Sequence, residues 1–134
     1  MRREEVITKK LKTKYKSQMI DITEQVKDDV VRLGVTNGLC TIFSSHTTAS
    51  IVFFENHDPK LQRDFLSALS RIAPADAAYA SDDDNAPAHI KSALCGQRVV
   101  LPVVNGQLFL GEWQAIYFCE FDGGRDREFH IQVI

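Results

Sequence analysis

The sequence lacks the long apolar segments and the one-sided charge that direct a protein to a membrane or to nucleic acid. No run approaches the ~20 apolar residues of a membrane span, and the charged start, Met1 to Glu5, leads into no apolar stretch of signal-peptide length. Sixteen basic residues against eighteen acidic ones leave a net charge of -2, which attracts neither nucleic acid nor anionic lipid. We therefore predict a cytoplasmic protein without nucleic-acid or membrane partners.

Cysteine and the common catalytic signatures are also scarce. The three cysteines, Cys40, Cys95 and Cys119, are odd in number and form no C-x-x-C pair, so reduced thiols are favoured over disulfides or a structural zinc. A G-x-S-x-G elbow is missing around Ser45-His46, and no glycine-rich phosphate loop is present. No organic cofactor is predicted.

The residues that are present suit one globular domain spanning residues 1–134. Hydrophobic residues make up 44% of the chain and charged residues 25%, and we find no repeat or linker. The first half predicts a weakly alternating edge strand at about 4–13, a short strand at 19–22 and a helix capped by Thr23. After a turn at Asn37-Gly38 come two apolar strands, 39–43 and 49–54, both expected to be covered on both faces.

The second half predicts two helices followed by β structure. Pro59 begins a helix with apolar residues at helical spacing, and a shorter helix starts near Asn85 and ends at Gly96 in a left-handed cap. Strands follow at 99–104, 108–121 and 127–134, with turns between them. The order ββαββααβββ indicates an α+β sandwich of mostly antiparallel sheet with helices packed on it.

The first candidate functional residue is His46. It lies in the polar break 44–48 between two apolar strands, where a loop at the end of a sheet presents side chains on a rigid scaffold. Imidazole serves as a metal ligand or as an acid or base near neutral pH. The alternative is a histidine that only hydrogen-bonds its own turn. The residues alone favour neither interpretation.

A second polar cluster covers residues 81–89. The helix dipole accounts for the carboxylates that precede the short helix. It does not account for His89, which lies one turn inside that helix. Together with His46, the residues Asp82, Asp84 and His89 could bind a divalent cation such as Mg²⁺, Mn²⁺ or Zn²⁺. Their spacing matches no zinc signature.

The last strand carries arginine at its charged end. Arg125 and Arg127 share the parity of the apolar residues that follow, so either could hold a carboxylate or phosphate. The alternative is a salt bridge to Glu120 or Asp122 within the protein. Residues of the opposite parity, including His130, are predicted to form a solvated face; His57 is predicted to be a surface residue and Trp113 a packing residue.

Several of these pieces occur together in one known family. They are His46-Thr47-Thr48-Ala49, Asp58-Pro59, Asp64, Asn85-Ala86-Pro87-Ala88-His89-Ile90, Pro102-Val103, Leu110-Gly111-Glu112-Trp113-Gln114, Glu120-Phe121-Asp122-Gly123 and Arg125-Asp126-Arg127. In this order, over almost the whole chain, the set resembles the YjbQ-like family, often labelled secondary thiamine-phosphate synthases. The positions of Ser81, Phe54 and Glu112 depart from the family's usual histidine, asparagine and threonine.

The resemblance implies a sandwich-like α+β domain that assembles as a homotrimer. It also implies a polar site built from the His46 motif, the helix start at His89 and the strand that carries Gln114. The family label implies weak joining of a pyrimidine diphosphate to a thiazole phosphate, a reaction that calls for Mg²⁺. A carboxylate in place of the missing histidine would favour Mg²⁺ or Mn²⁺ over zinc.

Two hypotheses follow. The first is a YjbQ-like enzyme acting on a small phosphorylated metabolite, with possible weak thiamine-phosphate synthase activity. His46 is then metal ligand or general base, His89 a second ligand, and Asp82 or Asp84 completes the coordination, while Arg127 holds an anionic group and Gln114 orients the substrate. The second is a trimeric metal- or metabolite-binding protein without turnover, since no nucleophile–base–orienter set is complete in the sequence.

Overall fold

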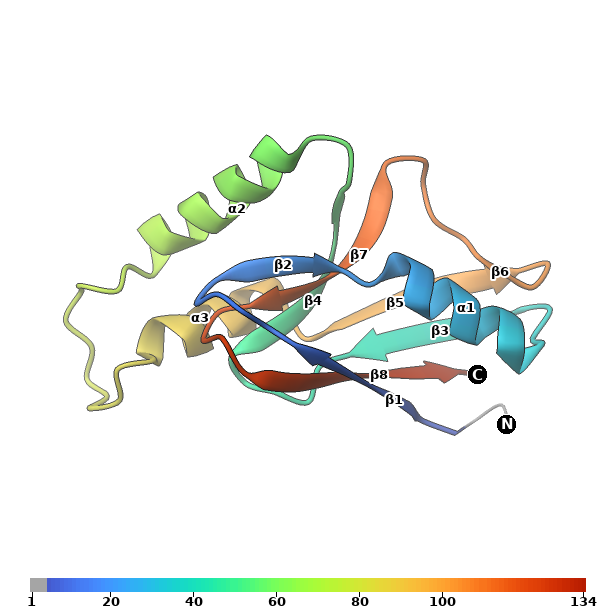
Figure 1. Ribbon diagram of the computed structural model, residues 1–134, viewed down its shortest axis with the longest axis horizontal. Coiled ribbons are helices and arrows are strands. Elements are labelled where there is room, and N and C mark those ends of the chain that lie inside the picture. Colours follow the sequence, from blue (N-terminus) through green and yellow to red (C-terminus); the bar gives the residue numbers. More distant parts are fainter. Residues whose placement is uncertain (1–4) are drawn as a thin grey trace.

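Two antiparallel sheets form the framework of the computed structural model, which describes residues 5–134 (Figure 1). The larger sheet has the strand order β1-β8-β3-β5-β6 and the smaller one β2-β7-β4. The strands are β1 (Ile7–Lys12), β2 (Gln18–Asp21), β3 (Gly38–Phe43), β4 (Ala49–Glu55), β5 (Arg98–Val104), β6 (Gln107–Leu108), β7 (Gln114–Glu120) and β8 (Asp126–Val133).

Local sequence explains where the helices begin and end. The helices are α1 (Thr23–Leu33), α2 (Pro59–Ile72) and α3 (Ala86–Cys95). At the start of α2 the Asp58 carboxylate accepts a hydrogen bond from the amide of Lys60, and Pro59 occupies the first turn, where no amide donor is needed. Gly96 ends α3 with φ at 82°, a value that glycine adopts without a Cβ clash. The predicted limits of these two helices are confirmed.

Strand β7 organises the layers because it is buried on both faces. Its residues Ile116 and Phe118 pack into the apolar core between the two sheets, which α1 closes with Val26 and Val30. The alternate residues Tyr117 and Cys119 face the other way, into a second cluster with Leu69 of α2 and Ala88 of α3. The result is a sandwich of two sheets with two helices on the smaller one, and the predicted fold class is confirmed.

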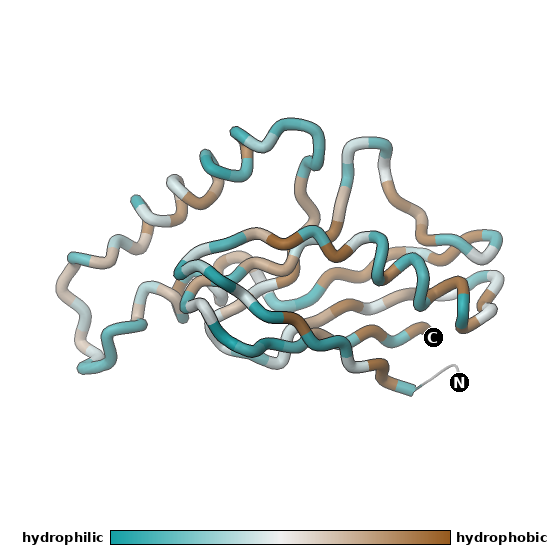
Figure 2. The backbone as a smooth tube through the Cα atoms, in the orientation of Figure 1, coloured by the Kyte–Doolittle hydropathy of each residue, from teal (hydrophilic) through white to brown (hydrophobic). Residues whose placement is uncertain are grey.

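Figure 2 shows apolar residues along the strands and hydrophilic residues in the loop that joins α2 to α3. Within residues 5–134 no helix is both long and apolar enough to cross a membrane.

Three local predictions are wrong, and each error has a physical reason. The expected strand 108–121 is broken at residues 109–113, which carry the chain from β6 in one sheet to β7 in the other. Strand β3 is covered on one face only, and Leu39 is 54% exposed, because no layer covers the outer side of the larger sheet. The cap of α1 is Ile22 rather than Thr23. The expected start of the first strand at residue 4 lies outside the described residues.

Thr23 instead joins a helix to a strand. Its Oγ1 donates to Asp21 Oδ1 over 2.6 Å and accepts the amide hydrogen of Ile116 over 2.9 Å. Strand β2 ends at Asp21, so this hydroxyl replaces the next hydrogen bond of the sheet. A buried amide hydrogen in β7 therefore depends on one side chain.

We expect Thr23→Val to lower the free energy of unfolding by about 1–3 kcal/mol, because the isosteric side chain leaves the buried amide of Ile116 without an acceptor. Thr23→Ser keeps the hydroxyl and serves as the matched control. Urea unfolding of both variants measures the difference. Equal stabilities for Val and Ser at this position would contradict the assignment.

Candidate functional site: the cleft beside His46 and Arg127

The loop between β3 and β4 holds His46 against the start of β8. The His46 amide donates to Ser44 Oγ over 3.1 Å, which tightens the turn. The ring nitrogen Nε2 accepts the backbone amide hydrogen of Glu128 over 3.0 Å. The side chain is half-buried. The His46 ring therefore bonds a residue of β8 and not its own turn.

This contact decides which proton the ring carries. A nitrogen that accepts an amide hydrogen is unprotonated, so the neutral ring has its proton on Nδ1. Burial, followed by the nearby Arg127 guanidinium, lowers the pKa of His46 below its ordinary value. In this position the ring offers an N–H donor from Nδ1 and no free lone pair. Service as a general base or metal ligand requires the ring to give up the Glu128 amide.

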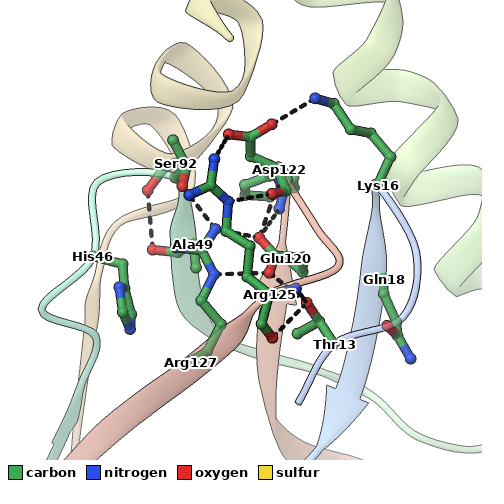
Figure 3. A network of polar contacts seen from close by, with 12 residues as sticks. Thr13, Lys16, Gln18, His46, Ala49, Ser92, Glu120, Asp122, Arg125 and Arg127 are labelled. Atoms are coloured by element: carbon green, nitrogen blue, oxygen red, sulfur yellow. Dashed lines mark hydrogen bonds and ion pairs between the residues drawn. The ribbon is translucent and has the colours of Figure 1, made fainter. Parts of the chain in front are cut away.

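Arg127 lies beside His46 and pairs with a carboxylate inside the protein (Figure 3). Its Nε and Nη2 donate to Glu120 over 2.7 and 2.5 Å, and Nη2 also donates to Thr48 Oγ1 over 2.7 Å. The residue is 6% exposed and Glu120 is fully buried. Thr13 Oγ1 donates a further hydrogen bond to Glu120 over 2.7 Å. The salt-bridge alternative for this arginine is confirmed.

The opposite charges of Glu120 and Arg127 compensate each other inside the protein. Burial by itself would raise the pKa of Glu120, but the hydrogen bonds from Arg127 and Thr13 outweigh it, and the net shift of that pKa is downward. Nη1 of Arg127 makes no hydrogen bond with residues 5–134. Arg127 also lines a cleft, with 6% of its surface exposed.

The neighbouring Asp122 forms a separate ion-pair group above this pair in Figure 3. Its carboxylate accepts from Lys16 over 2.5 Å and from Arg125 over 2.7 Å, and the amide of Asn85 adds a contact at 3.2 Å. Burial opposes ionisation of Asp122, yet these partners lower its pKa. Arg125 is therefore committed to Asp122, as the salt-bridge alternative also proposed.

The cleft itself has a volume of about 660 Å³, within the range of sites that hold small molecules. Its lining combines three cations with two carboxylates and the neutral imidazole: Lys10, Leu11, Lys12, His46, Asp126, Arg127 and Glu128. The ion pair of Lys12 with Asp126 is 3.9 Å long and exposed on both sides, so it is weak and leaves Lys12 free to meet a ligand.

The structure divides the predicted site residues among different places. His46 and Arg127 share the cleft, whereas His89 is exposed on α3 and does not line it. Asp82 is exposed in the preceding loop, and Asp84 lines a small cavity of about 210 Å³ beside Asn85. Gln114 lies in a third hollow, where its Oε1 accepts the amide hydrogen of Gly111 over 3.1 Å. Their proposed roles remain predictions.

A metal site built from the predicted residues is not assembled within one chain. Among residues 5–134, no three histidine, cysteine, aspartate or glutamate side chains lie together as a ligand group. Asp126 and Glu128 bring two carboxylates to the cleft, and Mg²⁺ is commonly held by one or two carboxylates together with phosphate oxygens of the substrate.

Sequence reasoning missed several residues of this region. Lys10 and Lys12 alternate along β1, a pattern that places both on one face of the strand. His130 was predicted to be solvated but is buried, stacked on Phe43 with ring centroids 4.8 Å apart. Trp113 was predicted to pack in the core, yet it is 53% exposed and contacts His57 edge-on. The alternation of residues along one strand does not show which of its two faces is covered by other parts of the protein.

The comparisons with known proteins identify the family. The model for the family described as UPF0047 protein YjbQ-like matches residues 7–134. The chain belongs to this YjbQ-like family. The family resemblance drawn from the sequence motifs is thereby confirmed.

Relatives are similar over nearly their whole length. The UPF0047 protein YugU of Bacillus subtilis is 39% identical over 128 residues, covering 95% of this chain and 97% of that protein. A YjbQ/UPF0047-family crystal structure from Clostridium acetobutylicum, described as uncharacterized, has a TM-score of 0.93 at 44% identity, with 96% and 99% coverage. A Sulfolobus solfataricus structure, described as of unknown function, has a TM-score of 0.92 at 32% identity, with 96% and 95% coverage.

We expect the folded protein to hold His46 neutral with its proton on Nδ1, because Nε2 accepts the Glu128 amide. Since the folded pKa is lowered, the unfolded chain takes up a proton first as the pH falls below 6.5. The free energy of unfolding should then decrease through the window between 6.5 and the lower folded pKa. It should decrease less in His46→Gln.

Two measurements check this expectation. Long-range proton–nitrogen NMR identifies the protonated ring nitrogen, and urea unfolding at a series of pH values compares wild type with His46→Gln. Protonation on Nε2, or identical pH dependence in the two proteins, would show that the assigned contact is wrong.

We expect Arg127→Met to destabilise the protein by about 3–5 kcal/mol, because it leaves Glu120 buried without its charged partner. The double variant Arg127→Met with Glu120→Leu removes both charges and should recover much of that loss. Thermal and urea unfolding of the two variants measure the effects. A double variant no more stable than Arg127→Met would show that the uncompensated carboxylate is not the cause.

Proposed function

We propose that the cleft binds a small phosphorylated metabolite and stabilises negative charge on its phosphate or diphosphate group. The observation that carries this proposal is that one cleft is lined by side chains with donors of different kinds: neutral His46, Arg127, Lys10 and Lys12. Donors fixed by the protein stabilise charge without reorganising when it develops.

The arrangement supports leaving-group stabilisation better than proton abstraction. When a diphosphate departs, its oxygens gain negative charge, and hydrogen-bond donors placed around them lower the barrier. His46 supplies such a donor while its other nitrogen is occupied by Glu128. The family label of a weak thiamine-phosphate synthase is consistent with this chemistry, because that reaction joins a pyrimidine diphosphate to a thiazole phosphate with loss of diphosphate.

The proposal includes a magnesium ion bound together with the phosphate group. Bound ions neutralise phosphate charge and orient the group, and Asp126 and Glu128 are the side chains of the cleft that would hold one. They also accept hydrogen bonds from polar or cationic parts of a ligand. A ligand that combines a phosphate with such a group therefore fits the mixed charge of the lining.

Assembly as a homotrimer is part of the same proposal. The outer face of the larger sheet exposes Leu39, Val100, Val104 and Ile134, each 40% or more exposed. Exposed apolar side chains gathered on one face are typical of a surface that another subunit covers. A neighbouring subunit could also bring its own His89 or Gln114 toward a shared site.

The second candidate is a binding protein without turnover. It is favoured by the engagement of both His46 and Arg127 in contacts within the protein, which leaves His46 without a free lone pair to act as a general base.

A binding and turnover experiment tests the proposal. With Mg²⁺ present, we expect inorganic diphosphate to bind and to shift the His46 ring resonances in NMR spectra. Replacing Lys10 and Lys12 together by Ala should weaken binding by roughly 10-fold or more, with a smaller dependence on salt concentration. Lys60→Ala, an exposed lysine on α2, is the matched control and should bind as the wild type does.

The same proteins, incubated with the pyrimidine diphosphate and the thiazole phosphate, distinguish enzyme from binder. Formation of thiamine phosphate that is lost in the lysine double variant supports the enzyme. Diphosphate binding without product supports the binding protein. Equal binding by the double variant and by Lys60→Ala would overturn the assignment of this cleft.

A further inference from the structure

A serine, a histidine and a threonine form a hydrogen-bonded series on the outer face of the larger sheet, where β3 ends; Leu39 and Ile134, on the surface proposed to meet another subunit, lie where β3 begins. Ser45 Oγ lies 2.8 Å from His130 Nε2, and Thr8 Oγ1 lies 3.0 Å from His130 Nδ1. The three residues come from the loop after β3, from β8 and from β1, and Thr8 is paired with His130 in the sheet register. The arrangement uses no residue that the proposed phosphate site needs.

We propose that Ser45 is a nucleophile activated by His130, with Thr8 orienting the imidazole, and that this centre cleaves small activated esters. A nucleophile within hydrogen-bond reach of a base that a third group orients is the geometric requirement for this chemistry. Both observed contacts are satisfied when the serine hydroxyl donates to Nε2 and the Nδ1–H donates to Thr8.

The surroundings hold the base and leave the nucleophile accessible. Only 9% of the His130 surface is exposed. The ring contacts Phe43, with ring centroids 4.8 Å apart, and this contact restricts its orientation. Ser45, in contrast, is exposed. Among residues 5–134, the Ser45 hydroxyl hydrogen-bonds His130 alone. A substrate can therefore reach the oxygen without displacing a packed side chain.

A carboxylate lies near the base of this series. One Glu128 carboxylate oxygen is 4.0 Å from His130 Nε2. Glu128 also lines the cleft described above, and Ser45 directly precedes His46 of that cleft. An ester that carries an anionic group could thus present its carbonyl to Ser45 while the cleft holds its charge.

The chemical steps balance without a further reagent besides water. As Ser45 Oγ bonds to the ester carbonyl carbon, its proton passes to His130 Nε2; the bond to the leaving oxygen then breaks, and that oxygen takes the proton. Water next attacks the acyl-serine, giving one proton to His130, and the Ser45 oxygen leaves and recovers it. The products are an acid and an alcohol, and nothing is oxidised or reduced.

The test uses an alkyl fluorophosphonate, which bonds through phosphorus to an activated serine oxygen with loss of fluoride. We expect intact-mass spectrometry to show one added group and peptide mapping to place it on Ser45. The wild type should also hydrolyse p-nitrophenyl acetate, and His130→Gln should lower that rate by ~10²-fold or more.

Matched variants separate a chemical role from a structural one. Ser45→Ala should lose labelling, while Ser81→Ala, which removes an exposed serine that contacts no histidine, should keep it. Thr8→Ser keeps a hydroxyl for Nδ1 and should retain activity that Thr8→Val loses, at equal melting temperature. Labelling on another residue, no labelling of the wild type, or unchanged hydrolysis by folded Ser45→Ala would each overturn the proposal. Diphosphate binding in the cleft is measured separately and is unaffected by this outcome.

Discussion

The buried ion pair of Glu120 and Arg127 is the constraint on which the functional region depends. Glu120 ends β7 in the smaller sheet, and Arg127 lies near the start of β8 in the larger one. Their two hydrogen bonds therefore join the sheets at the point where the chain passes between them. Thr13 and Thr48 bind the same pair and bring the end of β1 and the beginning of β4 to it. Without these extra hydrogen bonds, the desolvation penalty of the two buried charges would exceed their mutual attraction.

The position of the cleft follows from this connection. Arg127 is held by Glu120 and lines the cleft together with other residues of β1 and β8. The next residue, Glu128, uses its amide to hold His46, and the positive charge of Arg127 helps to keep that ring neutral. The ion pair thus fixes Arg127 in the lining of the cleft, and burial is the main reason that the pKa of His46 is lowered. The chemistry we propose for the cleft uses both properties.

Two centres of different character lie next to each other along β8. Residues 127 and 128 serve the cleft, whereas His130 belongs to the series with Ser45 and Thr8. Both depend on the loop after β3, since Ser45 and His46 are adjacent in the chain and point to different partners.

Local patterns in the sequence determined the helices, most strands and the family. Pro59, Gly96 and the alternating apolar residues act over a few positions, and the ordered motifs were sufficient for the resemblance that the comparisons confirmed. The choice of partners for polar side chains depended instead on contacts between residues about eighty positions apart, such as His46 with Glu128 and Ser45 with His130. Strand parity shows on which side a residue lies but not what covers that side. Only the packing of the two sheets decided that His130 is buried, that His89 lies outside the cleft and that Arg127 has a partner within the protein.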